Sequence, residues 1–329
     1  MKSLSSASPR EAAANLAILA LLILGPWAAL SAGHPFYVTL ATKAAILALA
    51  ATGLHLALGL GGLVSFGHAA FFGLGGYAAG ILAAHAGSGE ALILGWAGSR
   101  EILTMILAAM GLALLAALPI GAISLRTSGV YFLMITLAFA QMIYYFALSW
   151  PAYGGDDGLS FRRGIFPGLN SARPLPYFWI CLGALLIGLA LFQILRASRF
   201  GTALEATRQN PQRVEALGIE PFGLRLTAFA LSAMMVGAAG ALFANLNRFA
   251  SPSMLSWQMS GELIVLILLG GRGRLLGPTA GAVLFVAMEH VLGGWTERWQ
   301  FFLGLAVLGV AVFARGGLLG LIAGGRRDG

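Results

Sequence analysis

Long runs of apolar residues, separated by short polar segments, dominate this chain of 329 residues. Because the apolar core of a bilayer is about 30 Å thick and needs roughly 20 apolar residues per helix, each run is a candidate transmembrane helix. The runs predict an all-α polytopic membrane protein, with residues 1–329 forming a single transmembrane domain. The ten predicted spans, of which the eighth is short, are 15–31, 36–58, 61–84, 102–124, 129–149, 176–195, 224–246, 258–271, 276–293 and 299–314.

The first run fits two descriptions. Residues 15–31 follow the basic residues Lys2 and Arg10 and precede the small residues Ser31 and Ala32, which is also the arrangement of a secretory signal. We expect an uncleaved anchor. The predicted topology of the later spans is the same whether the segment is an anchor or a cleaved signal.

Residues 197–223 interrupt the apolar pattern with the only long polar stretch that carries many charges of both signs. Three helix-boundary signals occur in it, and together they predict two short helices on the membrane surface. Such a helix pair is suited to docking a soluble partner, whereas the alternative is a solvated loop joining two spans. The signals are a capping box from Thr202 to Glu205, the N-cap pair Asn210 and Pro211, and the helix stop Gly218.

Glycines cluster at the start of the third span, within residues 59–80. Four of them lie in residues 59–67, and Ser65 stands where an N-cap would restart a helix through His68. A discontinuous helix leaves backbone N–H groups free in the membrane, and its positive dipole end can hold a carboxylate. Tight packing of a glycine-rich helix is the alternative, and for His68 we favour a packed or pore-lining role over a ligand or proton carrier. The candidate residues of a translocation path are Ser65, Gly67, His68 and Phe72.

Composition and charge support a membrane protein and suggest its orientation. Hydrophobic residues make up 59% and charged residues 10% of the chain, against roughly 45–50% and 25% in soluble domains. With both termini inside, the cytoplasmic segments hold 13 basic residues and the outer segments 6, while Lys43 lies within a span. This bias predicts cytoplasmic termini in a bacterial inner membrane. The net charge of +8 then reflects topology and attraction to anionic lipid, and needs no nucleic acid.

Catalytic motifs are missing from the sequence. Neither of the two lysines, Lys2 and Lys43, stands in a P-loop, so we expect no ATP site on this chain. No metal-binding spacing or nucleophile elbow occurs, and the single cysteine, Cys181, allows no internal disulfide. Intramembrane carboxylates, which gradient-driven carriers usually display, are limited to Glu262 and Glu289. A secondary carrier is therefore the weaker alternative, and a structural or signalling membrane protein is a third.

Five segments, taken in order, resemble the permease subunits of ABC importers for branched-chain amino acids, and most closely the longer of the two paired permeases. The resemblance runs from about Leu40 to Leu319. One segment departs from the general Glu-Ala-Ala form of the family's coupling loop, because Glu205 and Ala206 are followed by Thr207. The segments are LVSFGHAAFFGLGGYAAGIL, RTSGVYFLMITLAFAQM, GGDDGL, RFGTALEATRQNPQRVEALGI and LILLGGRGRLLGPTAGAVL.

The resemblance implies an assembly and a mechanism. Its expected members are a second related permease forming a heterodimer, two cytoplasmic ATPases that carry the ATP and Mg, and an extracytoplasmic substrate-binding protein. The ATPases would drive alternating access through the coupling loop. The substrate would be a branched-chain amino acid, with urea, short amides and aromatic acids as alternatives. The residues expected to couple to the ATPase are Thr202, Leu204, Glu205, Ala206, Asn210, Pro211, Leu217, Gly218 and Ile219.

Overall fold

The computed structural model describes residues 9–89, 98–171, 173–271, 273–296, 298–313 and 317. These residues form twelve α-helices, one π-helix (η1, Leu56–Leu60), two 3₁₀ turns (η2, Pro151–Tyr153; η3, Pro252–Leu255) and two short strands (β1, Leu159–Ser160; β2, Phe249–Ala250). The α-helices are α1 Pro9–Ser31, α2 Pro35–His55, α3 His68–Ser88, α4 Ile102–Ser124, α5 Val130–Leu148, α6 Pro174–Ala197, α7 Arg199–Gln209, α8 Pro211–Ala216, α9 Pro221–Asn247, α10 Trp257–Gly270, α11 Gly277–Gly293 and α12 Trp299–Phe313.

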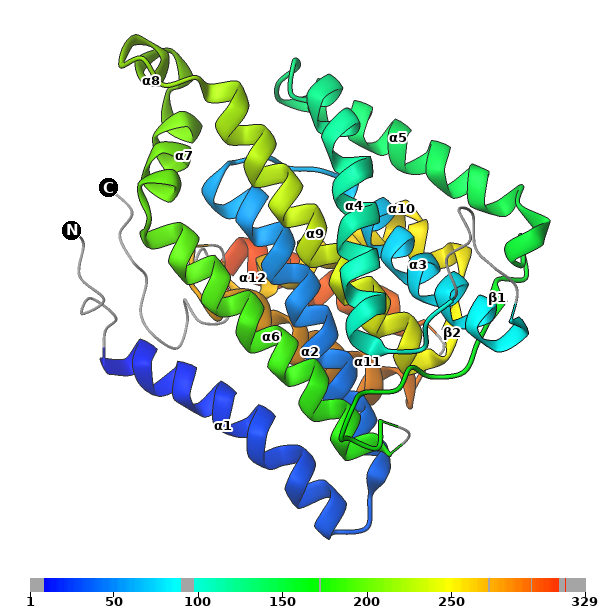
Figure 1. The fold of residues 1–329 in the computed structure, drawn as a ribbon. Coiled ribbons are helices and arrows are strands. Elements are labelled where there is room, and N and C mark those ends of the chain that lie inside the picture. The colour runs from blue at the N-terminus through cyan, green and yellow to red at the C-terminus, as the bar shows by residue number, and fades with distance from the viewer. Residues whose placement is uncertain are drawn as a thin grey trace.

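Helices α2 and α9 form the centre of the bundle. Helix α2 packs against α6, α9 and α11, and α9 also packs against α3 and α4 (Figure 1). Glycines allow α3 and α9 to approach backbone to backbone, since a Cβ atom at Gly75 or Gly240 would overlap the main chain of the opposite helix. Small residues at a helix interface are how membrane helices gain close van der Waals contact. These two glycines are therefore used in helix packing.

The outer helices leave apolar side chains uncovered. Helix α5 lies at one edge of the bundle and α1 at another (Figure 1), and both carry large exposed apolar residues, such as Tyr131 and Phe146 on α5 and Leu16 and Trp27 on α1. In water such faces would be unfavourable, but lipid chains or a partner membrane subunit can cover them. The fold is thus consistent with a bilayer environment.

Each of the ten predicted apolar runs falls on a helix, although residues 61–67 of the third run are not helical. Among the described residues, six helices are long and apolar enough to cross a membrane: α2 with η1, α3, α4, α5, α6 and α9. Residues 15–31 of α1, together with α10 and α12, are shorter apolar helices, and the last residue of the tenth run, 314, lies outside the described residues. The protein is a multi-pass membrane protein, and its count of ten spans stays a prediction.

The segment between α5 and α6 fastens the end of the bundle opposite α7 and α8. Glycines with positive φ form the turn around Asp156 and Asp157. Strands β1 and β2 then pair antiparallel. The Arg163 guanidinium donates to the carbonyls of Asn245 and Leu246 at 3.1 and 2.9 Å, which satisfies carbonyl groups at the C-terminal end of α9.

Candidate functional site

Helix α7, the first of the two surface helices, begins earlier than predicted. Its N-cap is Ser198, whose Oγ accepts a hydrogen bond from the Gly201 N–H at 3.3 Å. Thr202 lies inside the first turn, and its hydroxyl donates to the Ser198 carbonyl at 3.0 Å. The expected capping box from Thr202 to Glu205 is therefore wrong. Ser198 follows α6 directly, and its extended backbone separates the two helices and caps the second.

Helix α8 has the predicted boundaries. The Asn210 side chain accepts a hydrogen bond from the Arg213 N–H at 3.1 Å, and Pro211 occupies the first helical position. At the other end Gly218 adopts φ +82°. The Gly218 and Ile219 N–H groups donate to Glu215 and Val214 at 2.9 and 3.2 Å, which is a Schellman motif. The two-helix prediction for this polar segment is confirmed.

Leucines on this helix pair face opposite ways. Leu204 is fully buried in a cluster with Leu56, Leu60, Phe192 and Ala228. Its side chain anchors α7 to the transmembrane body, so the expectation that it faces an ATPase is wrong. Leu217 and Ile219 are 78% and 40% exposed and lie beyond α8, which protrudes from the bundle (Figure 1). The other predicted coupling residues are exposed or partly exposed: Thr202, Glu205, Ala206, Asn210, Pro211 and Gly218.

Two arginines tie the C-terminal end of α7 to the bundle. Arg208 Nη1 donates to the Gly59 carbonyl in η1 at 2.6 Å, and Arg225 Nη2 of α9 donates to the Thr207 carbonyl at 3.2 Å. The Arg208 stem lies against Gly62, where a Cβ atom would come within 2.8 Å of the Arg208 Cγ and where φ is +68°. Gly62 therefore gives both the left-handed conformation and the space that this contact requires.

These two arginines are not among the coupling residues predicted from the sequence. A basic residue in the last turn of a helix is a usable signal, because it compensates the negative end of the helix dipole, and Arg208 shows that signal. No local pattern in the sequence indicates the contact of Arg225, because its hydrogen bond joins α9 to a different helix, α7.

Residues 61–67 connect η1 to α3 without helical structure. Ser65 does not occupy the N-cap position, which belongs to Gly67; its Oγ instead accepts from the Gly67 N–H at 3.0 Å. Ser260 of α10 holds the next turn, accepting from the Ala69 N–H at 2.8 Å and donating to the Phe66 carbonyl at 2.6 Å. Ala70 N–H donates to the Gly67 carbonyl.

These hydrogen bonds change the interpretation of the glycine-rich segment. The expectation that free N–H groups at the start of α3 hold a substrate carboxylate is wrong for Gly67, Ala69 and Ala70, because protein oxygens already accept from all three. A discontinuous transmembrane helix with a role in the translocation path stays a prediction.

His68 is enclosed by the protein. The Ser232 hydroxyl donates its only hydrogen to the Gly53 carbonyl at 2.7 Å, so at 2.8 Å it must accept from the Nε2–H of His68. The ring is fully buried and lies edge to face with Phe71 and Phe229. This geometry agrees with a packed polar group. Phe72 is buried as well, against Phe243.

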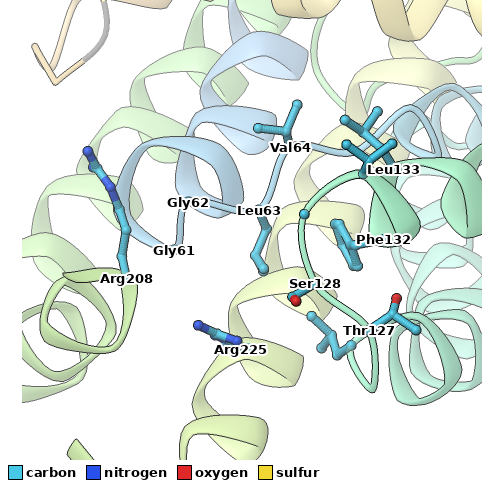
Figure 2. A pocket seen from close by; sticks show the side chains of 13 residues that line it. Gly61, Gly62, Leu63, Val64, Thr127, Ser128, Phe132, Leu133, Arg208 and Arg225 are labelled. Carbon is cyan, nitrogen blue, oxygen red and sulfur yellow. The ribbon is translucent and has the colours of Figure 1, made fainter. Parts of the chain in front are cut away.

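A cavity of 310 Å³ lies between residues 61–64 and the connection from α4 to α5, next to Arg208 and Arg225. Figure 2 shows the Arg225 side chain lying between residues 61–64 and the loop that carries Thr127 and Ser128. The side chains of Leu63, Phe132 and Leu133 supply apolar wall. The cavity thus adjoins both the surface helices and the start of the non-helical segment.

The comparison with known proteins decides the family. Residues 36–313 match the family described as the permease component of branched-chain amino acid transport systems. The chain belongs to this family. That match begins within α2 and leaves α1 outside it. The matched region includes helices α7 and α8, the non-helical residues 61–67 and the residues that line the cavity.

Individual relatives agree. The chain is similar to the high-affinity branched-chain amino acid transport system permease protein LivM of Salmonella typhimurium and of Escherichia coli, with 28% identity in each case over 93% of this chain and 75% of the relative. The autoinducer 2 import system permease protein LsrC of Yersinia pseudotuberculosis is 31% identical over 42% of this chain and 41% of its own length. No solved structure matches the chain.

Two of the charged residues predicted to lie within spans of this permease-family chain are paired. Lys43 Nζ of α2 lies 2.6 and 2.7 Å from the two carboxylate oxygens of Glu289 on α11. The two side chains are only 29% and 28% exposed. Pairing removes the isolated charges that would be costly in the membrane. In the described part of the chain, no group of three or more His, Cys, Asp or Glu residues is placed to bind a metal.

Proposed function

We propose that this chain is the transmembrane permease subunit of an ATP-driven ABC importer that moves branched-chain amino acids, or related small polar solutes, into the bacterial cytoplasm. The observation that carries the proposal is the family match over residues 36–313, which spans nearly the whole helical bundle. The LivM relatives, by their names, serve branched-chain amino acid transport. We place the chain in the inner membrane with both termini in the cytoplasm, from the bias of its basic residues. Of these, Lys2, Arg272, Arg315, Arg326 and Arg327 lie outside the described residues.

The assembly that we propose contains a second related permease, two cytoplasmic ATPases that bind ATP and Mg, and an extracytoplasmic substrate-binding protein. The exposed apolar residues Leu217 and Ile219 at the tip of the helix pair are suited to a groove on an ATPase. Helix α5, with its uncovered apolar face, has the character expected of a surface shared with lipid or with the second permease. No cofactor is assigned to this chain.

Coupling would run from the helix pair through Arg208 into the bundle. ATPase closure would move α8 and α7, and Arg208 would transmit that displacement to Gly59 and Gly62. These glycines flank the start of residues 61–67, whose far end is held by Ser260 of α10. Motion of the helix pair would thereby reach the start of α3 and reposition α3 and α10 during alternating access, within a path that includes the surroundings of Ser65 and Gly67.

A gradient-driven secondary carrier is the alternative function. The sequence offers two carboxylates for ion coupling, Glu262 and Glu289. Glu289 is neutralised by its ion pair with Lys43, which leaves Glu262 alone and weakens this alternative. A capped and anchored helix pair protruding from the bundle also has no evident use in a carrier that works without partners.

Reconstitution of the complete system tests the proposal. Liposomes carrying both permeases and both ATPases, with binding protein outside and ATP inside, should accumulate leucine, isoleucine or valine. The matched control contains ATPases with the P-loop lysine replaced, and should show none of this uptake. Urea, a short amide and an aromatic amino acid tested in parallel define the substrate class. Uptake by this chain alone, driven by an ion gradient without ATP, would establish the secondary carrier instead.

A further inference from the structure

The cavity of 310 Å³ beside the surface helices contains positive charge without a counter-ion. Arg225 uses Nη2 to hold the Thr207 carbonyl, and its Nε is buried without a hydrogen-bond partner. Arg208 uses Nη1 to hold the Gly59 carbonyl. Within the described ranges the ion pair of Lys43 is the one salt bridge, so neither arginine is paired with a carboxylate there. Within the described residues Arg225 Nη1 makes no hydrogen bond, and a cationic guanidinium in the wall of a cavity favours an anionic occupant.

Most of the remaining wall is apolar. Leu63 points toward Ser128 and Arg225 from the non-helical segment, and Phe132 points toward Ser128 from the first turn of α5 (Figure 2). Val64 and Leu133 are also in the lining. Ser128 adds a hydroxyl group at the loop that precedes α5. One end of the cavity is thus suited to a carboxylate and the other to an aliphatic group. Its volume is at the small end of the roughly 300–1,000 Å³ that is usual for small-molecule sites, so it suits a ligand the size of a single amino acid.

We propose that this cavity is a cytoplasmic-side binding site for the transported aliphatic amino acid. The substrate carboxylate would bind the Arg225 guanidinium, and the substrate side chain would pack against Leu63 and Phe132. The inference rests on the proposed importer function, and adds to it a binding site that does not use the backbone N–H groups of Gly67 and Ala69, which already have protein partners.

Occupancy of this site would act on coupling. Arg225 holds the C-terminal end of α7, and the non-helical segment forms the opposite wall. A ligand that contacts both would link the ATPase-docking helices to that segment. A high cytoplasmic amino-acid concentration would then favour the occupied state and slow the transport cycle, because a ligand stabilises the conformation that it binds best.

Direct binding to the permease pair tests the proposal. The full-length chain and its partner permease are placed in nanodiscs of phosphatidylcholine, without ATPase, ATP or binding protein, and titrated with radiolabelled leucine. Leucinol, which lacks the carboxylate, should compete at least about tenfold more weakly than leucine. Arg225→Gln should weaken leucine binding by a similar factor. Arg126→Gln, a basic residue on the neighbouring loop that does not line the cavity, is the matched control and should bind normally.

A second variant covers the possibility that Arg225→Gln does not fold. Ser128→Trp fills the cavity and leaves the hydrogen bond from Arg225 to Thr207 in place, and it should abolish leucine binding at intact melting temperature. Normal leucine binding by Ser128→Trp, equal competition by leucinol, or no leucine binding by the unmodified pair overturns the inference. Leucine binding that is displaced completely when phosphatidylglycerol is added would assign the cavity to lipid phosphate and also overturn it.

ATP-driven uptake by the complete system, measured in parallel, separates this inference from the proposed function. Normal uptake together with absent cavity binding removes only the inference. Absence of uptake in the complete unmodified system removes the proposed function.

Discussion

Replacing Leu204 or Leu217 by alanine removes the same atoms from opposite sides of the α7–α8 pair. Leu204 is completely buried among Leu56, Leu60 and Phe192. A buried Leu→Ala change costs about 2–5 kcal/mol, from lost apolar burial and the cavity left behind. Leu217 is 78% exposed, so its truncation should alter the stability of the isolated permease by less than about 0.5 kcal/mol.

Leu217→Ala should have the larger effect on ATPase binding, although it has the smaller effect on the stability of the permease. If Leu217 inserts into a groove on the ATPase, truncation should cost at least about 1–2 kcal/mol of binding, which is roughly a fivefold to thirtyfold weaker complex. Leu204→Ala should lower the melting temperature of the permease pair. It should weaken ATPase binding only indirectly, through displacement of α7. Two measurements on nanodisc-embedded permeases separate the cases: thermal unfolding without ATPase, and ATPase affinity by biolayer interferometry at a temperature well below melting.

A particular pattern would refute this reasoning. An unchanged melting temperature for Leu204→Ala would show that α7 is not anchored by this side chain. Normal ATPase affinity for Leu217→Ala would show that the tip of the helix pair is not the docking surface, and Ala206 on the exposed side of α7 would become the next residue to test.

Three further outcomes are expected. Arg208→Ala should reduce substrate transported per ATP hydrolysed several-fold while ATPase binding is retained, because it removes the hydrogen bond to the Gly59 carbonyl that joins α7 to η1; an unchanged ratio would exclude a coupling role. Gly67→Val should lower the amount of assembled permease, since a Cβ atom there already lies 3.1 Å from the Thr136 Cβ and carbonyl oxygen of α5; normal amounts with blocked uptake per complex would instead support a substrate path. Cysteine at Gln212 should react only with cytoplasmic reagent and cysteine at Asp157 only with external reagent, and labelling of both from one side would show a miscounted span.

The sequence by itself determined the helices and several of their ends. Apart from residues 61–67, the apolar runs lie on helices, because the hydrogen bonds of a helix are local and a run of suitable length requires no partner to be recognised. The same holds for α8, whose ends depend on Asn210, Pro211 and Gly218 acting on main-chain groups only a few residues away. The start of α7 was missed for a local reason as well, because Ser198 and Thr202 are both good caps and the end of α6 selects the first.

Only the tertiary structure decided what these helices contact. Leu204 and Leu217 are equivalent in the sequence, but the position of α7 over η1, α6 and α9 buries one and leaves the other exposed. Arg208 reaches a carbonyl 149 residues away, and Lys43 pairs with a carboxylate 246 residues away. The N–H groups at the start of α3 look free in the sequence, yet Ser260 of α10 accepts from one of them. Contacts of this kind depend on how helices distant in the sequence pack together, and hydrophobic periodicity and capping signals carry no information about that arrangement.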